Sequence, residues 1–338
     1  MYRLLTTRTP LVLTLIGCIL AGLLAGCAPK APEKPAAPPP PAPPPGFASA
    51  EDTMKAVLSG QVKLVQAPKE MPADVVETKD IEYGRVGDIP LLLDLYMPKQ
   101  PKGPLPVLVF IHGGGWKKGE RGDYKYYTVY YAQQGYAAVT IAYRFSDVVK
   151  FPGAVEDAKC AVRWVRANAA KYGFDPNKIA ALGGSAGGHL SMMLGYTAGD
   201  PSLEGNGGHA EFSSAVQAVV NFYGPSDLTT EQAKVFPEVV SFIGKPYEEA
   251  ADVYAKASPL PYVKPGCPPT LIFHGVIDEL VPIAQSDTLA QKLEASGVPC
   301  KYVKIEGWPH TMDAAQPVND YCRYFLDEFL ATHLPAAQ

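Results

Sequence analysis

The sequence predicts an α/β fold whose core is a mostly parallel, doubly wound sheet. Three observations support this prediction. Short apolar runs alternate with helical patterns over most of the chain, the run Pro106–Ile111 is continuously apolar, and glycine-rich turns follow several of the runs. Continuous apolar runs are typical of strands buried on both faces, and their alternation with helices is typical of parallel strands joined by crossovers.

The expected elements follow in chain order. An antiparallel hairpin is expected at one edge of the sheet, because two strand patterns are separated by a turn that contains Gly84, Gly87 and Asp88. Strands are expected over 75–83, 90–96, 106–111, 137–142, 179–182, 216–222, 270–273 and 300–305. Helices are expected near 154–171, from 186 onward, near 283–295 and near 318–332.

The segment Gly183-Gly-Ser185-Ala-Gly187 joins a buried strand to a helix that opens with small residues. A serine on such a sharp turn has its hydroxyl exposed, and the small residues around it avoid collisions with the neighbouring strand and helix. The helix N-terminus favours negative charge at the same place. Ser185 is therefore the expected nucleophile.

A second glycine-rich turn, His112-Gly-Gly-Gly-Trp116, follows the strand 106–111. Bare backbone N–H groups at the end of a strand can hold a developing oxyanion, at about 3–4 kcal/mol for each donor. The expected donors are the N–H groups of Gly113, Gly114 and Ala186, while Gly115 stays open as an alternative.

A serine nucleophile needs a base and an acid. The chain has six histidines, at 112, 189, 209, 274, 310 and 333. We expect His310 to be the base, because it lies on a loop after a strand, from which an imidazole can reach across the sheet. We expect Asp278, just past another buried strand, to orient the imidazole. Asp227 is the second candidate for the acid, and its alternative role is a loop brace.

The order Ser185, Asp278, His310 is that of the α/β-hydrolase triad. The motifs at 112–116, 183–188, 274–278 and 307–310 resemble those of α/β-hydrolase esterases of the hormone-sensitive-lipase-like kind, and most closely the bacterial carboxylesterase and feruloyl-esterase-like (BD-FAE-like) branch. The resemblance runs from about residue 75 to 335. It implies an eight-stranded sheet with helices on both faces and a small cap. Gly184 departs from many lipase-type members, which carry an acidic residue there.

Two regions fall outside the core pattern, and a tyrosine cluster has two possible roles. Residues 48–70 look like a helix that could fold over the site, and residues 225–265 are placed where hydrolases insert caps, so we expect a partial lid and an accessible cleft. Tyrosines 124, 126, 127, 130 and 131 form a cluster after the glycine loop. We expect this cluster to pack on the sheet, and the alternative is an aromatic or sugar-binding cleft.

The N-terminus has the features of a bacterial lipoprotein. Residues 1–26 combine a basic start, with Arg3 and Arg8, and an apolar stretch of secretory length, which ends in Leu24-Ala-Gly-Cys27. Cys27 is the expected lipid attachment site, and three acyl chains would anchor the chain firmly. Residues 27–46 are proline-rich and form a stiff spacer, and 47–338 form the catalytic domain. We expect a cell-envelope lipoprotein, in the outer membrane if the source is Gram-negative.

Composition excludes some functions. The formal net charge is −4, and it becomes −6 without residues 1–26, which hold two arginines and no acidic residue. This balance argues against a nucleic-acid partner. Of the cysteines at 160, 267, 300 and 322, the preferred bridge joins Cys267 to Cys300, and free buried thiols are an equal alternative. No spacing of His, Cys and acidic residues resembles a metal site, so neither a metal nor another cofactor is expected.

The sequence thus predicts a serine carboxylesterase without cofactors, which hydrolyses short-chain or carbohydrate-linked (acetyl or feruloyl) esters through an acyl-enzyme. Arylformamidase or exopeptidase activity with the same triad is the alternative within the class. A non-catalytic lipoprotein that binds glycan is the alternative of another class. The oligomeric state stays open.

Overall fold

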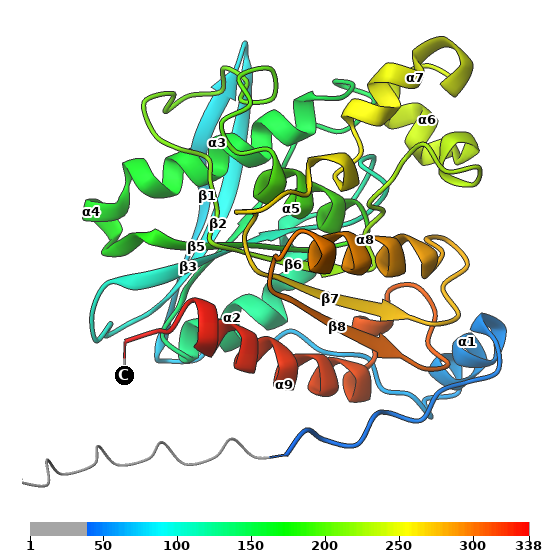
Figure 1. Ribbon diagram of the computed structural model, residues 1–338. Helices are drawn as coiled ribbons and strands as arrows, with labels where there is room; N and C mark the ends of the chain where they lie inside the picture. The colour runs from blue at the N-terminus through cyan, green and yellow to red at the C-terminus, as the bar shows by residue number, and fades with distance from the viewer. Residues whose placement is uncertain (1–38, 338) are drawn as a thin grey trace, which may run out of the picture. The chain divides into compact units, whose positions relative to one another are not determined.

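The computed structural model describes residues 39–337, so the expected signal sequence and Cys27 lie outside the described residues. Its core is one eight-stranded sheet in the order β1-β2-β4-β3-β5-β6-β7-β8 (Figure 1). The strands are β1 Val75–Val86, β2 Ile89–Pro98, β3 Leu105–Ile111, β4 Ala137–Ile141, β5 Phe174–Gly184, β6 Ala218–Phe222, β7 Thr270–Gly275 and β8 Cys300–Ile305. β1 and β2 form the expected antiparallel hairpin at one edge, and the strands from β4 to β8 run parallel. The predicted α/β-hydrolase architecture is confirmed.

Helices cover both faces of this sheet. Those of the described residues are α1 Ala50–Leu58, α2 Lys125–Gln133, α3 Gly153–Ala167, α4 Ala169–Tyr172, α5 Ala186–Tyr196, α6 Pro237–Ile243, α7 Tyr247–Lys256, α8 Ala284–Ala295 and α9 Gln316–His333, with short 3-10 turns η1 Arg121–Tyr124, η2 Ala233–Val235, η3 Leu260–Tyr262 and η4 Met312–Ala314. Helices α3, α5 and α8 pack into one apolar core, and α2 and α9 pack into the other, on the opposite face (Figure 1).

The connections out of β3 and into β5 fix the position of the site. β4 pairs with one side of β3 and β5 with the other, so the chain reverses its direction along the sheet between them. In open α/β sheets, ligands bind at the carboxyl ends of the strands at such a reversal. Both expected site loops, 112–116 after β3 and Ser185 after β5, begin at this point.

The tyrosine cluster divides between the two expected roles. Tyr127 and Tyr131 are buried and stack on Phe110 of β3, as an aromatic helix face would. Tyr124 and Tyr126 instead line a cleft that also contains Ser185. Helix α2 therefore supplies a core face and, together with η1, part of the cleft wall.

Residues 48–70 do not cover the site. After α1, the chain pairs with the segment that follows His310: the Val65 N–H donates to the Ala314 carbonyl at 2.8 Å, and the Gln316 N–H donates to the Lys63 carbonyl at 2.8 Å. The expectation of a helix over the site is corrected, because α1 is short and the rest of the segment is an extended strap. Residues 225–265, which include α6 and α7, form a small cap. Two of its residues, Phe236 and Glu238, line the cleft.

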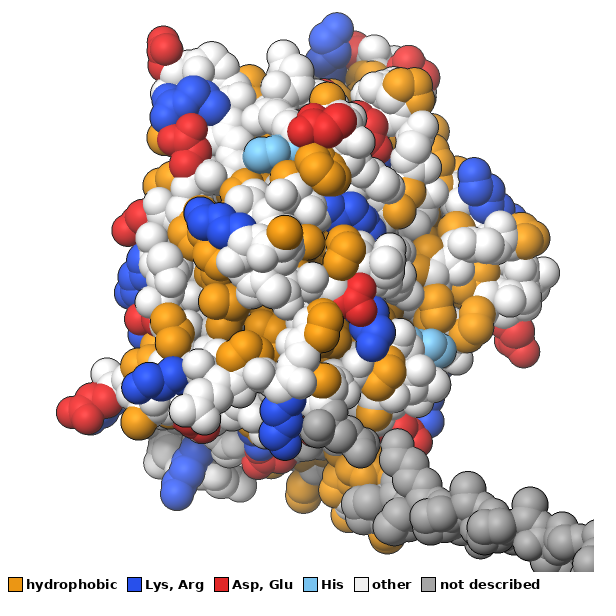
Figure 2. Space-filling model, turned by 90° about the vertical axis from the view of Figure 1, so that its left-hand side faces the viewer, with side chains coloured by type: hydrophobic (Ala, Val, Ile, Leu, Met, Phe, Trp, Pro, Cys, Tyr) orange, Lys and Arg blue, Asp and Glu red, His pale blue; other side chains and the backbone are white. Residues whose placement is uncertain are grey.

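The four cysteines of the described residues are all free thiols, so the bridge preferred from sequence, Cys267 to Cys300, is not formed. The Cys267 thiol instead donates to the Tyr262 carbonyl, with a sulfur–oxygen distance of 3.7 Å. Within residues 39–337, no helix is long and apolar enough to cross a membrane and no His, Cys and acidic cluster is arranged to hold a metal ion. On the face in Figure 2, acidic and basic side chains are interspersed, without a single-sign patch.

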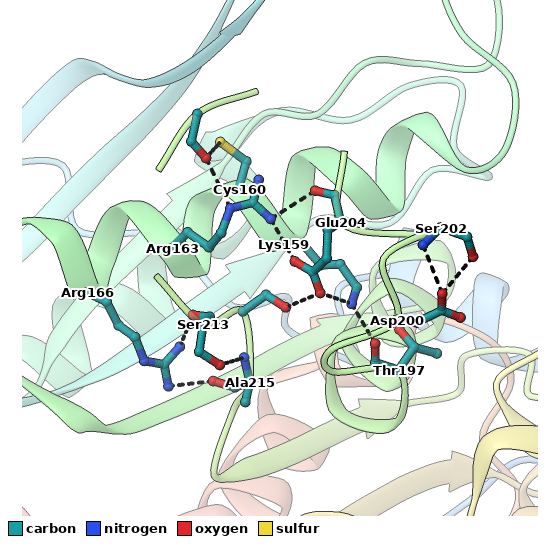
Figure 3. A network of polar contacts seen from close by, with 12 residues as sticks. Lys159, Cys160, Arg163, Arg166, Thr197, Asp200, Ser202, Glu204, Ser213 and Ala215 are labelled. Carbon is teal, nitrogen blue, oxygen red and sulfur yellow. Dashed lines mark hydrogen bonds and ion pairs between the residues drawn. The ribbon is translucent and has the colours of Figure 1, made fainter. Parts of the chain in front are cut away.

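A buried ion network fastens the long connection between α5 and β6 to α3 (Figure 3). The Glu204 carboxylate accepts from Lys159 Nζ and from Arg163 Nη1, both at 2.8 Å, and from Ser214 Oγ at 2.7 Å. The Lys159 and Arg163 side chains are only 0% and 2% exposed. Two buried cations thus depend on one carboxylate.

We expect Glu204→Ala to lower the free energy of unfolding by about 3 kcal/mol, because it leaves both cations buried without an anion. The measurement is urea unfolding followed by circular dichroism. Glu211→Ala, at an exposed position of the same connection, is the control and is expected to change stability by less than about 0.5 kcal/mol. Equal urea midpoints of unfolding for the two variants would contradict the role of Glu204 as the anion that the two buried cations require.

Candidate active site

Ser185 lies on the sharp turn between β5 and α5, with φ 55° and ψ −121°. This left-handed backbone costs on the order of 1–3 kcal/mol for a residue with a side chain. Gly187 allows the turn to fit, because a Cβ there would lie 1.9 Å from the Ile111 carbonyl oxygen at the end of β3. The first turn of α5 therefore touches β3 directly, and Ser185 lies on the expected strand-to-helix turn, where it is half-buried.

The structure brings the three expected residues Ser185, His310 and Asp278 into one chain of hydrogen bonds. His310 Nε2 lies 2.9 Å from Ser185 Oγ, and His310 Nδ1 lies 2.6 Å from Asp278 Oδ2. The Asp278 side chain is 0% exposed and that of His310 is 11% exposed. The imidazole thus joins a partly open hydroxyl to a buried carboxylate.

The Asp278 carboxylate is held by four donors. The Leu280 and Val281 N–H groups donate to Oδ1, each at 2.9 Å, while His310 and His274 approach Oδ2 at 2.6 Å and 3.3 Å. Burial raises the pKa of Asp278, but the hydrogen bonds from the two histidines and the charge of His310 outweigh it and lower the pKa to about 2. The carboxylate is therefore ionised throughout the neutral range.

His274 is a residue of the site that sequence reasoning missed. Its Nε2 lies 2.8 Å from the Val281 carbonyl and its Nδ1 lies 2.7 Å from Ser286 Oγ. A carbonyl accepts only, so Nε2 carries the proton and the Ser286 hydroxyl donates to Nδ1. The Nε2–H is donated to the Val281 carbonyl and also faces Asp278 Oδ2 at the longer distance of 3.3 Å. The spacing of four residues to Asp278 was the signal available in the sequence.

The carbonyl groups of the glycine loop are held by the side chains of Tyr143 and His112, and its N–H groups point the other way. The Tyr143 hydroxyl donates to the His112 and Gly113 carbonyls at 3.1 Å and 3.3 Å, and His112 Nδ1 lies 2.9 Å from the Gly113 carbonyl. In a trans peptide the N–H points opposite to the carbonyl. The Gly113 and Gly114 N–H groups therefore point away from Tyr143. Gly113 lies against the serine turn, where a Cβ would be 3.4 Å from Ser185 Cβ.

Other candidates from the sequence have structural roles. His112 is buried and braces the glycine loop, and burial lowers its pKa. His189 is fully buried and its Nε2 lies 2.7 Å from the Ala257 carbonyl. Asp227, the second candidate for the acid, accepts from the Thr229 N–H at 2.8 Å and from its hydroxyl at 2.6 Å, and thus stabilises its own loop.

Two cavities meet at Ser185. The first is narrow, about 50 Å³, and mostly apolar, with walls from Trp116, Ala186, Pro225 and Val239 among others. The second is wide, about 830 Å³, and its walls include His310, the glycine loop and several polar side chains. His310 lines only the wide cavity. Each side of the serine thus offers a different environment to a bound molecule.

The wide cavity holds a polar cluster that sequence reasoning also missed. The hydroxyls of Tyr223 and Tyr126 donate to the buried carboxylate of Asp313, the latter at 3.3 Å, and the Tyr223 ring lies 4.6 Å from the His310 ring. Burial raises the pKa of Asp313 although both hydroxyls donate to it. Asp313 lies three residues after His310, but no local pattern links it to Tyr223, 90 residues earlier.

Comparison with known proteins places this chain in one class. The BD-FAE family model matches residues 93–293. Esterase LipC of Mycobacterium tuberculosis is 35% identical over 79% of this chain and 71% of its own length. Esterase LipQ of the same organism is 32% identical over 80% of this chain and 65% of its own length, so the chain spans just under two thirds of that relative.

Solved structures with a similar fold are also described as esterases. A truncated carbohydrate esterase from gut microbiota superposes with a TM-score of 0.69 at 28% identity, over 78% of this chain and 99% of that one. Esterase 2 of Thermogutta terrifontis, with propionate bound, has a TM-score of 0.67 at 30% identity, over 81% and 99%.

The fold and these relatives define a carboxylic ester hydrolase of the α/β-hydrolase fold. More narrowly, the chain belongs to the BD-FAE family.

We expect Gly187→Ala to lower kcat/KM for a p-nitrophenyl acetate assay by at least about a hundredfold, because the added Cβ must displace the Ile111 carbonyl and with it the serine turn. Gly103→Ala, whose Cβ would meet only the Ala337 side chain, is the control. Activity of the Gly187 variant within a few-fold of the parent would show that the close approach is not required.

Proposed function

We propose that the protein is a serine carboxylesterase in which Ser185 is the nucleophile, His310 the general base and Asp278 the residue that orients the imidazole. The observation that carries the proposal is the continuous hydrogen-bond chain from Ser185 Oγ through His310 to the buried Asp278 carboxylate. Nε2 of the imidazole can accept a proton from the serine hydroxyl, because the carboxylate bonded to Nδ1 stabilises the positive charge that results.

In the proposed reaction, Ser185 Oγ attacks the ester carbonyl as its proton moves to His310 Nε2. The N–H groups of Gly113, Gly114 and Ala186 stabilise the oxyanion, and the free N–H groups at the start of α5 add to this positive potential. His310 then gives its proton to the leaving alkoxide. Water, activated by the same nitrogen, hydrolyses the acyl-enzyme and restores Ser185.

The two cavities support an assignment of the two halves of the ester. His310 must protonate the leaving alcohol, so the alcohol occupies the cavity that His310 lines, which is the wide one. The acyl group is then left for the narrow apolar cavity. A volume of about 50 Å³ suits an acetyl or similar short group. We therefore propose short-chain esters, including acetyl esters of carbohydrates, as substrates.

We further propose that Cys27 is lipid-modified and that residues 27–46 act as a spacer between a membrane of the cell envelope and the enzyme. The support is the sequence pattern alone, with its basic start, apolar stretch and Leu24-Ala-Gly-Cys27. Expression of the full chain and of Cys27→Ser tests this. We expect the parent chain in the membrane fraction, with the added mass of acyl chains on Cys27, and the Cys27→Ser variant in the soluble fraction. If both proteins are found in the same fraction and Cys27 of the parent carries no acyl mass, the anchor is refuted.

Hydrolysis of p-nitrophenyl esters from C2 to C12 tests the nucleophile. We expect Ser185→Ala to lose about four to six orders of magnitude in kcat. Ser202→Ala, an exposed serine whose side chain bonds only to Asp200, is the control. Labelling with a fluorophosphonate probe is expected for the parent and not for the Ser185 variant. A parent that neither turns over esters nor takes the label would refute the proposal.

The same ester series tests the acyl cavity. We expect the highest kcat/KM at C2 to C4 and a shift of the optimum to longer chains in Val239→Ala, which enlarges the narrow cavity. Val240→Ala, at the neighbouring position outside the cavity walls, is the control. An optimum that stays in place in the Val239 variant would assign the acyl group to the wide cavity.

The pH dependence of kcat/KM tests the roles of the base and the acid. We expect activity to fall on the acid side with a slope of one proton, as a single general base requires. Asp278 adds no second proton above about pH 4, because its lowered pKa of about 2 keeps it ionised there. A two-proton slope, or activity that stays constant down to about pH 4, would contradict the assignment.

A further inference from the structure

The loop that carries His310 leaves the last strand of the sheet and therefore has the sheet on one side only. β8 pairs with β7 and forms an edge. On the inner side, the Trp308 carbonyl accepts from the Ile277 N–H at 3.3 Å. Thr311, directly after His310, has a φ of 57°. Such a left-handed backbone persists only where its surroundings fix it, so the loop needs support on its outer side as well.

Gly46 and Phe47, which precede α1, provide the first part of this support, beyond the carboxyl ends of β7 and β8 (Figure 1). The Phe47 N–H donates to the Gly307 carbonyl at 2.8 Å. The two backbones approach closely, because a Cβ at Gly46 would lie 2.2 Å from the Glu306 carbonyl oxygen. The Phe47 ring meets the Trp308 ring edge-on, with 5.3 Å between the ring centres. These contacts hold the loop just before the histidine.

The Trp308 side chain is held by packing alone. It is 1% exposed, and its ring N–H has no hydrogen-bond partner among residues 39–337. A ring without a polar bond shifts when a packing neighbour such as Phe47 is removed. The Trp308 backbone would shift with it, and this backbone is bonded to Ile277, the residue before Asp278. Phe47 is thus one residue removed from the support of both His310 and its carboxylate.

The strap supports the chain on the other side of His310. The Val65 N–H donates to the Ala314 carbonyl, and the Gln316 N–H donates to the Lys63 carbonyl, each at 2.8 Å. These two bonds form a single antiparallel bridge between the strap and the segment after η4. One pair of contacts therefore lies before the histidine and a second pair lies after it.

We name Gly46, Phe47 and the strap residues 63–65 the N-terminal clasp. We propose that the clasp positions His310 for proton transfer, and that Phe47 is a positioning residue for ester hydrolysis although it lines neither cavity. The inference rests on the proposed function, because the clasp acts through His310 as the general base. It makes activity depend on the segment through which the chain enters the catalytic domain.

Hydrolysis of p-nitrophenyl acetate by full-length variants tests the role of Phe47. His310 acts in both steps of acyl transfer but does not bind the substrate. We therefore expect Phe47→Ala to lower kcat at least about tenfold and to change KM by less than about twofold. Phe47→Tyr keeps the ring and is expected to retain kcat within about twofold of the parent. In a His310→Ala background, Phe47→Ala is expected to cause no further loss of the residual rate.

Tyr321→Ala is the matched control for Phe47→Ala. Tyr321, on α9, is half-buried like Phe47 and packs on the same apolar core. Its ring also meets another ring edge-on, that of Phe325, with 5.1 Å between the ring centres. We expect the control to keep the kcat of the parent, because its contact does not involve the histidine loop.

Val65→Pro breaks the clasp at its second contact. Proline has no N–H to donate to the Ala314 carbonyl, so we expect the same loss of kcat at unchanged KM. Gln66→Pro is its control, because Gln66 is exposed and its N–H makes no backbone hydrogen bond within the described part of the chain. The two clasp variants are independent, since each removes a contact on a different side of the histidine.

Several results would overturn the inference. One is a parental kcat in both Phe47→Ala and Val65→Pro, and another is an equal loss in their controls. A third is a loss from Phe47→Ala that is as large in the His310→Ala background as in the parent, because the clasp would then act on the whole site. If circular dichroism shows that neither clasp variant folds, the clasp is a requirement of the fold rather than of His310, which also overturns it.

Failure of the proposed function has a different outcome. In that case the parent neither hydrolyses p-nitrophenyl acetate nor reacts with a fluorophosphonate, or His310→Ala keeps the rate of the parent. A parent that is active and depends on His310, but whose kcat is unchanged in the clasp variants, retains the esterase assignment and loses only the role of the clasp.

Discussion

The close approach of helix α5 to strand β3 is the constraint on which the site depends. Because Gly187 has no side chain, the first turn of α5 rests on the Ile111 carbonyl, where a Cβ would be only 1.9 Å away. This contact places the serine turn next to the loop that leaves β3. Ser185, the free N–H groups of a helix start and the glycine loop therefore come together through local backbone contacts. Backbone geometry, rather than side-chain packing, positions this half of the site.

The other half depends on a buried charge. Asp278 and His310 come from loops after β7 and β8, which are neighbours in the sheet. Gly275 lets these loops approach, since a Cβ there would lie 2.1 Å from the Trp308 carbonyl. Four donors around Asp278 offset the cost of burying its carboxylate, and this fixed anion orients His310. Backbone strain is found in both halves of the site, since Trp116, Ser185, Tyr223 and Thr311 all have positive φ values.

Sequence patterns predicted the sheet, the hairpin edge, the serine turn and the partners of His310, because these depend on local signals: apolar runs, glycine spacing and the order of three motifs. They did not predict the Tyr223–Asp313 contact, which joins two loops 90 residues apart through a side-chain pair with no periodic signal. The role of His274 was missed for another reason, since its spacing to Asp278 was visible but its tautomer depends on Ser286. The strap was mistaken for a lid because a helical pattern does not say which surface it meets.

The contact made by the segment before α1 has a mechanical consequence. The chain enters the catalytic domain at Gly46 and Phe47, where the Phe47 N–H donates to the Gly307 carbonyl at 2.8 Å and the Phe47 ring packs edge-on against Trp308 at 5.3 Å. Trp308 is two residues before His310. A pulling force applied through the segment before Gly46 would therefore act first on the loop that contains Gly307, Trp308 and His310. The point where the described chain joins the domain and the loop that carries His310 are therefore mechanically coupled.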